Sequence, residues 1–113
     1  MPPSLLVANT DSLGEQIQRA FPDAKVVKAL NTMTAALMVN PGAVGDGDHH
    51  VFVCGDDPGA KAQATELLTR FGWRNVVDLG DITGARATKM VLPIWIRLLG
   101  TLQTPMFTFK VVT

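Results

Sequence analysis

The sequence of 113 residues is long enough for one domain and short for two. Ten basic and ten acidic side chains cancel, which argues against a nucleic-acid partner and against binding to an anionic membrane surface. A single cysteine, Cys54, excludes an internal disulfide and favours a reducing compartment.

Targeting and membrane signals are not recognisable. The first residues carry neither the basic segment nor the long apolar segment of a signal peptide. The most apolar stretch, Met90–Leu102, contains Pro93, Arg97 and Gly100 and is too short to span a bilayer. We therefore expect a cytoplasmic protein with no membrane partner. A charged fraction of only 18% also suggests that apolar surface is kept for another chain.

The first part of the chain alternates strand and helix patterns. An apolar run predicts an edge strand over residues 5–8. Ser12 and Glu15 have the spacing of a capping box at the start of a helix, and Pro22 ends that helix. The predicted inward face of the helix consists of Leu13, Ile17, Ala20 and Phe21. A buried strand is predicted over Ala24–Leu30.

The middle of the chain repeats this alternation. Residues 31–40 predict a short helix, residues 42–48 a loop and residues 50–54 a second strand. Asp57 is the predicted N-cap of a helix that ends at Gly72. The predicted inward face of that helix consists of Ala60, Ala64, Leu67, Leu68 and Phe71.

A third strand, over residues 76–79, precedes the last predicted helix, Thr83–Leu102, which Pro93 should bend. The apolar face of this helix consists of Met90, Leu92, Ile94, Trp95, Leu98, Leu99 and Leu102. Because a small sheet covers only part of so wide a face, we expect either a homodimer contact through this helix or a missing domain that covers it. A closing strand is predicted over residues 107–112. The alternation predicts a single α/β domain over residues 1–113.

The sequence lacks the motifs that bind a nucleotide or build a catalytic centre. Gly42, Gly45 and Gly47 do not have the G-x-G-x-x-G spacing, and Gly80 and Gly84 are not followed by the Lys-Ser/Thr of a P-loop. There is no G-x-S-x-G elbow. We therefore predict no catalytic side chain and no autonomous dinucleotide site.

One cluster contains the side chains of a possible metal site, namely Asp46, Asp48, His49, His50 and Cys54. The adjacent His49 and His50 point to opposite sides of an extended backbone. Cys54 lies in a strand, where a thiol most often serves as a small buried apolar group. We therefore predict no metal site and keep a small metal-binding domain as an alternative.

Three segments together carry a resemblance to a known family. They are Val26–Thr32 (VVKALNT), Val51–Asp57 (VFVCGDD) and Val77–Arg86 (VDLGDITGAR). In order, spacing and turn residues, they resemble the C-terminal part of the NADP oxidoreductases similar to coenzyme F420-dependent NADP reductase, over residues 9–112. The resemblance implies a Rossmann-type fold whose N-terminal half, with the glycine-rich loop, is missing here, and a dimer to which the C-terminal part contributes.

The resemblance also implies a site. Family members transfer a hydride between the nicotinamide of NADPH and an acceptor such as a deazaflavin, so Ala29, Leu30, Asn31 and Thr32 would border the cleft for both rings. Asn31 and Thr32 can hydrogen-bond a carboxamide or a ring carbonyl, and equally they can cap the following helix. A histidine often stands at the position of Asn31 in the deazaflavin reductases, which leaves a flavin-like acceptor open.

Two functions of different classes follow from these patterns. The first is a fragment of an NADP(H)-dependent oxidoreductase with coenzyme F420 or a flavin as acceptor, which binds its cofactors only in the complete enzyme. The alternative is a non-enzymatic α/β module that dimerises and binds no cofactor.

Overall fold

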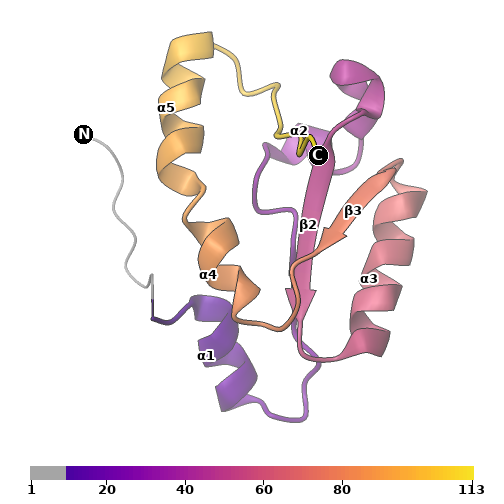
Figure 1. The fold of residues 1–113 in the computed structure, drawn as a ribbon, viewed down its shortest axis with the longest axis vertical. Coiled ribbons are helices and arrows are strands. Elements are labelled where there is room, and N and C mark those ends of the chain that lie inside the picture. The colour runs from indigo at the N-terminus through magenta and orange to yellow at the C-terminus, as the bar shows by residue number, and fades with distance from the viewer. Residues whose placement is uncertain (1–9) are drawn as a thin grey trace.

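Three strands form a mixed sheet in the computed structural model, which describes residues 10–113 (Figure 1). β1 (Val27–Ala29) pairs antiparallel with β2 (His50–Gly55), and β2 pairs parallel with β3 (Asn75–Asp78). The carboxyl end of β1 therefore lies at the opposite end of the sheet from the carboxyl ends of β2 and β3. The predicted α/β architecture is confirmed, and the predicted strand over residues 5–8 lies outside the described residues.

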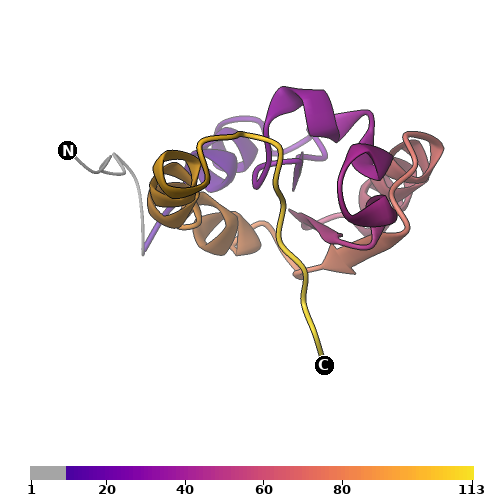
Figure 2. The same ribbon diagram turned by 90° about the horizontal axis from the view of Figure 1, so that it is seen from above.

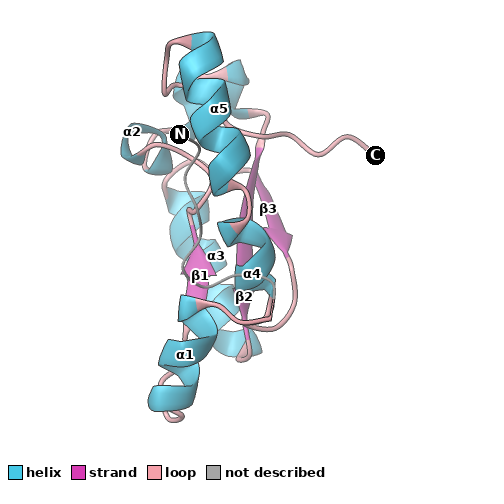
Figure 3. Ribbon diagram, turned by 90° about the vertical axis from the view of Figure 1, so that its left-hand side faces the viewer, coloured by secondary structure: helices cyan, strands magenta, loops and turns pink. Residues whose placement is uncertain are grey.

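The helices lie on both faces of this sheet. They are α1 (Leu13–Ala20), α2 (Ala35–Met38), α3 (Pro58–Arg70), α4 (Gly84–Lys89) and α5 (Leu92–Leu102), with 3-10 turns at Pro41–Ala43 and Gly45–Gly47. α3 packs on one face of the sheet and α4 on the other, and α5 extends beyond α4 (Figures 1 and 3).

The main core lies between the sheet and the helices α2 and α3. Its buried side chains are Met33, Leu37, Val51, Val53, Leu68 and Trp73. Val51 and Val53 point to this face because alternate residues of a strand share a face. The indole N–H of Trp73 donates to the carbonyl of Met38 at 2.8 Å, so the polar atom of this buried ring has its partner.

The opposite face of the sheet touches the start of α4. Cys54 is fully buried there. A Cβ atom on Gly84 would lie 2.9 Å from the Cβ of Cys54, so only a glycine lets α4 approach β2 this closely. The next residue, Ala85, is fully buried and packs against Gly14 of α1.

The predicted helix caps are confirmed. The Ser12 hydroxyl accepts from the Glu15 N–H at 3.2 Å at the start of α1. The Asp57 carboxylate accepts from the Ala60 N–H at 2.7 Å at the start of α3. Gly72 follows α3 with a φ of 106°, the left-handed region that favours glycine after a helix.

The predicted inward face of α1 is wrong. Leu13, Ile17 and Phe21 are 56%, 42% and 63% exposed. The buried residues of the helix are Gly14 and Glu15, because α1 packs on α4 rather than on the sheet. Part of the predicted face of α3 is exposed as well, since Leu67 is 49% exposed beside the buried Leu68.

The predicted helix Thr83–Leu102 is two helices. α4 ends at Lys89 and α5 begins at Leu92. Pro93 lies in the first turn of α5, where its missing N–H costs nothing, whereas its ring would clash with the carbonyl four residues earlier in a continuous helix. The predicted bend is therefore a break. Within residues 10–113, no helix has both the length and the apolar character needed to cross a membrane.

The predicted closing strand over residues 107–112 is wrong. This segment runs over the start of β2 without entering the sheet (Figure 2). His50 N–H donates to the Phe109 carbonyl at 2.9 Å, and Val111 N–H donates to His50 Nδ1 at 3.1 Å. Phe107 packs on Trp95 of α5, with ring centroids 5.2 Å apart. Aromatic packing and two hydrogen bonds hold this segment in place of a strand ladder.

Candidate functional site

The chain turns sharply where β1 ends. Leu30 has a φ of 60°, a left-handed conformation that is uncommon for a residue with a branched side chain. Such a conformation costs about 1–2 kcal/mol. It ends β1 after Ala29 and starts the turn that contains Asn31 and Thr32. Because backbone strain of this kind gathers at functional sites, the turn is a candidate on structural grounds alone.

Asn31 binds the last turn of α4. Its side-chain NH2 donates to the Thr88 carbonyl at 2.5 Å, across 57 residues of sequence. Within the described residues, the Asn31 carbonyl oxygen has no partner, and the side chain is exposed. The amide therefore has one N–H fixed by the fold, and its second N–H and its carbonyl oxygen remain for a ligand.

Thr32 has the reverse character. It is 2% exposed, and its hydroxyl has no hydrogen-bond partner among residues 10–113. A buried hydroxyl without a hydrogen-bond partner costs about 1–3 kcal/mol of stability, so a hydrogen bond to this atom would be favourable.

The alternative role of Asn31 and Thr32 as helix caps is wrong. The N-cap of α2 is Thr34, and its side chain makes no capping bond. The predicted helix over residues 31–40 is shortened to α2 because the turn occupies its first residues. Ala29 and Leu30 are half-buried and pack against the core beneath the turn. The four predicted residues thus occupy the end of β1 and the strained turn that follows it, between the core and α4.

Lys28 and Lys89 were missed by the sequence analysis. Lys28 lies opposite Cys54 in the β1–β2 pair, so both side chains are on the face that α4 covers. Lys89 is the last residue of α4, next to the Thr88 carbonyl that binds Asn31. Burial, and to a lesser extent the charge of Lys89, lowers the pKa of the Lys28 ammonium. The available signal was a lysine in the middle of an apolar strand.

The residues of the possible metal cluster do different things. His49 is buried, contacts the Pro41 carbonyl through Nε2 at 2.8 Å and packs its ring edge-on against Trp73. Asp48 forms an ion pair with Lys110 at 2.7 Å. His50 accepts from the C-terminal segment, and burial raises the pKa of the Cys54 thiol. Among residues 10–113, no three histidine, cysteine or carboxylate side chains come together as metal ligands.

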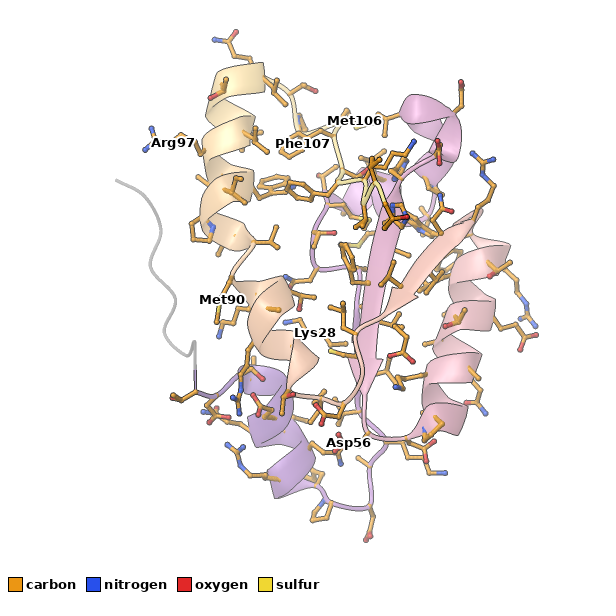
Figure 4. The ribbon with its side chains drawn as sticks, in the orientation of Figure 1. Lys28, Asp56, Met90, Arg97, Met106 and Phe107 are labelled. Atoms are coloured by element: carbon orange, nitrogen blue, oxygen red, sulfur yellow. The ribbon has the colours of Figure 1, made fainter. Side chains whose placement is uncertain are left out.

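A shallow hollow at the other end of the sheet does not compete with the turn. Asp56, at its edge, lies below the sheet in Figure 4. Its carboxylate accepts from the Ile82 N–H at 3.0 Å, and its neighbour Asp57 caps α3. The structural work of both carboxylates explains why they are there.

Similar proteins agree with the fold. No protein-family profile matches the chain. A crystal structure of a candidate F420-dependent NADP reductase from Arthrobacter sp. FB24 matches all of this chain with 60% identity and a TM-score of 0.97. The predicted resemblance to the NADP oxidoreductases similar to F420-dependent NADP reductase is confirmed over the whole length of this chain.

Two curated relatives are more distant. Metalloreductase STEAP3 of Rattus norvegicus is 34% identical over 89 residues, which are 74% of this chain and 17% of that protein. The F420-dependent NADP reductase of Methanocaldococcus jannaschii is 27% identical over 97 residues, which are 86% of this chain and 43% of that protein. The chain thus spans less than half of these two proteins and 51% of the Arthrobacter protein.

Proposed function

We propose that this chain supplies the acceptor side of a site for hydride transfer between NADP(H) and a flavin-like or deazaflavin acceptor. The observation that carries the proposal is the strained turn after β1, which presents the exposed Asn31 amide and is followed by Thr32, whose buried hydroxyl has no partner among residues 10–113. Two relatives are named as F420-dependent NADP reductases, and a third is named a metalloreductase. All three names describe reduction.

The residues of the turn fit the demands of this chemistry. NADPH supplies the hydride, and the acceptor ring takes up the two electrons and the hydrogen. The protein must hold two flat rings in contact and keep water away, and it needs no acid or base side chain for this. Ala29 and Leu30 give an apolar floor. Asn31 and Thr32 offer hydrogen bonds to a ring carbonyl or a carboxamide, which fix the orientation of a ring.

The nucleotide itself needs a second structural unit. A pyrophosphate is held by main-chain amides of a G-x-G-x-x-G turn, and this sequence has no such turn. The relatives have about as much chain again as the part that this protein matches. We infer that the remainder of such a protein, or a separate chain of that kind, provides the dinucleotide site.

A second copy of the chain is the proposed partner. α5 carries a single charged residue, Arg97, and its exposed apolar side chains are Leu92, Ile94, Ile96 and Leu102. Several exposed apolar side chains on one helix suit burial in an interface, and a helix with one charge brings little like-charge repulsion to a contact with its own copy. A dimer without any cofactor would be the non-enzymatic alternative.

The acceptor side of the proposal is tested by binding. FMN and oxidised coenzyme F420 are fluorescent, and each is titrated with the chain. Asn31→Ala and Thr32→Val should each weaken binding about tenfold, since each removes one proposed hydrogen bond to the ligand. Asn40→Ala is the matched control, because Asn40 is exposed and its side chain makes no capping bond. Equal affinities for all four proteins would contradict the assignment of the turn.

A further inference from the structure

Lys28 is a half-buried cation on an otherwise apolar strand. Its partner in the β1–β2 pair is Cys54, and Cys54 lies against Gly84 at the start of α4. The Lys28 side chain therefore leaves the sheet on the α4 side, and Figure 4 shows it in the space between α4 and the sheet. An ammonium in this position gives up part of its hydration, which costs free energy unless something compensates it.

Two further donors come from segments next to it. Asn31 follows β1 and is fixed to the Thr88 carbonyl, and the residue after Thr88 is Lys89, at the end of α4. The charge of Lys89 acts on Lys28, where it disfavours the ammonium form. The end of β1 and the last turn of α4 thus bring two cations and an amide into one region of the molecule. The repulsion between the two ammonium groups destabilises the fold unless a negative charge offsets it.

No carboxylate balances these two lysines. Residues 10–113 contain five ion pairs, and neither lysine belongs to any of them. In the same part of the chain, neither ammonium donates a hydrogen bond, and no aspartate or glutamate contributes to the charge felt by Lys28. Residues 1–9 (MPPSLLVAN) have no acidic side chain that could do so. A negative charge that compensates both lysines would come from outside the chain.

We propose that Lys28, Lys89 and Asn31 form a binding site for a phosphate monoester. A phosphate monoester carries nearly two negative charges at neutral pH, which match two ammonium groups, and its oxygens accept from ammonium and amide donors alike. The set offers several donors and a single acceptor oxygen, the Asn31 carbonyl, which suits an anion and not a metal ion. The phosphate could belong to the acceptor or to the nicotinamide nucleotide, and this part of the proposal rests on the proposed function. The existence of the phosphate site does not depend on it.

Inorganic phosphate is the direct probe. Calorimetric titration of the chain at constant ionic strength should show one binding event that equal concentrations of chloride do not produce. Lys28→Gln and Lys89→Gln should each weaken phosphate binding about tenfold, the effect of one lost charge-assisted hydrogen bond. Lys28→Arg keeps the charge and should retain most of the affinity.

Lys25→Gln is the matched control. It removes the same charge from an exposed lysine three residues earlier in the chain, and it should change phosphate binding less than about twofold. Thermal melts show whether each variant is folded before it is titrated. No phosphate binding by the folded chain, or an equal loss from Lys25→Gln and Lys28→Gln, would overturn the proposal.

Two ligand pairs distinguish the source of the phosphate. FMN differs from riboflavin, and NADPH from NADH, by one phosphate monoester. If the acceptor brings the phosphate, FMN binds more tightly than riboflavin, and Lys28→Gln abolishes the difference. If the nucleotide brings it, the same holds for NADPH against NADH. The phosphate site and the proposed function can therefore be disproved independently. Binding of inorganic phosphate tests the two lysines without any ring ligand. Comparing the acceptor affinities of Asn40→Ala and Thr32→Val tests binding of the ring without changing a lysine.

Discussion

Glu15 shows how one residue can serve two elements. Its carboxylate receives the Ser12 hydroxyl at 2.8 Å within the cap of α1, and it receives Arg86 of α4 through two hydrogen bonds of 2.8 and 2.6 Å. The Glu15 side chain is only 6% exposed, whereas that of Arg86 is 34% exposed. A bidentate pair of this kind is stronger than an ordinary surface ion pair because it is partly shielded from water. The capping-box glutamate therefore also joins α1 to α4.

Replacing Glu15 by glutamine should lower the free energy of unfolding by about 1–2 kcal/mol, because the charge of the bidentate pair is lost while the shape is kept. Urea denaturation measures the change. Glu66→Gln is the control, since Glu66 forms a fully exposed pair with Arg70 on α3. If both variants shift the denaturation midpoint equally, the Glu15–Arg86 pair is not the tie between the two helices.

The same carboxylate should make stability depend on pH. The Arg86 guanidinium, opposed by burial, holds the pKa of Glu15 below its ordinary value of 4.5. The folded state therefore binds fewer protons than the unfolded state in this range, and stability falls as pH falls. The contribution is complete above the unfolded pKa and is lost as the pH passes down through the folded pKa. The stability difference between the native protein and Glu15→Gln should thus shrink as the pH falls from neutral to below the ordinary carboxyl pKa of 4.5. A constant difference would contradict this.

At the scale of elements, the contact between α4 and β2 depends on one missing side chain. An alanine at position 84 would place its Cβ 2.9 Å from the Cβ of Cys54, and neither atom can move without its backbone. Gly84→Ala should therefore destabilise the protein by about 1–3 kcal/mol, the usual cost of overpacking. Gly42→Ala is the control, because a Cβ there meets nothing within 4 Å. A Gly84→Ala variant as stable as Gly42→Ala would show that α4 adjusts freely.

α5 carries the proposed contact with a second copy. Ile94 is 55% exposed, and a charge at this position should prevent burial of the helix in a dimer. Ile94→Asp is expected to be a monomer by light scattering coupled to size-exclusion chromatography. Leu67→Asp is the matched control, since Leu67 is 49% exposed on α3, on the other side of the molecule in Figure 1. A native chain that is already a monodisperse monomer would sink the dimer proposal.

At the scale of the whole molecule, local sequence patterns predicted the helices and strands more accurately than they predicted which faces of these elements are buried. The N-caps at Ser12 and Asp57 could be predicted because a capping hydrogen bond joins residues within four positions of each other. The spacing of Leu13, Ile17 and Phe21 correctly indicated a helix with an apolar side. It could not say that this side would face away from the sheet, since that depends on which other element covers it.

The candidate site could be predicted from the resemblance to a family, but not from sequence motifs or periodicity. Residues 29–32 were singled out through the family, because no motif marks them. The left-handed Leu30 is invisible in sequence, since leucine rarely takes that conformation, and the Asn31–Thr88 bond joins positions 57 residues apart. Lys28 and Lys89 meet for the same long-range reason. The tertiary fold brings the segments of these residues together, and sequence periodicity does not predict such long-range contacts.

The central claim is that this chain provides half of a hydride-transfer site, with the turn after β1 facing the acceptor. It is tested most directly in a hybrid of this chain with the part of the Arthrobacter protein that it does not match. NADPH oxidation is followed by absorbance with F420 or FMN as acceptor. We predict that the hybrid oxidises NADPH, that the chain alone does not, and that Asn31→Ala in the hybrid lowers the rate about tenfold or more. A folded hybrid that is inactive with both acceptors, or whose rate is unchanged by Asn31→Ala, would contradict the account.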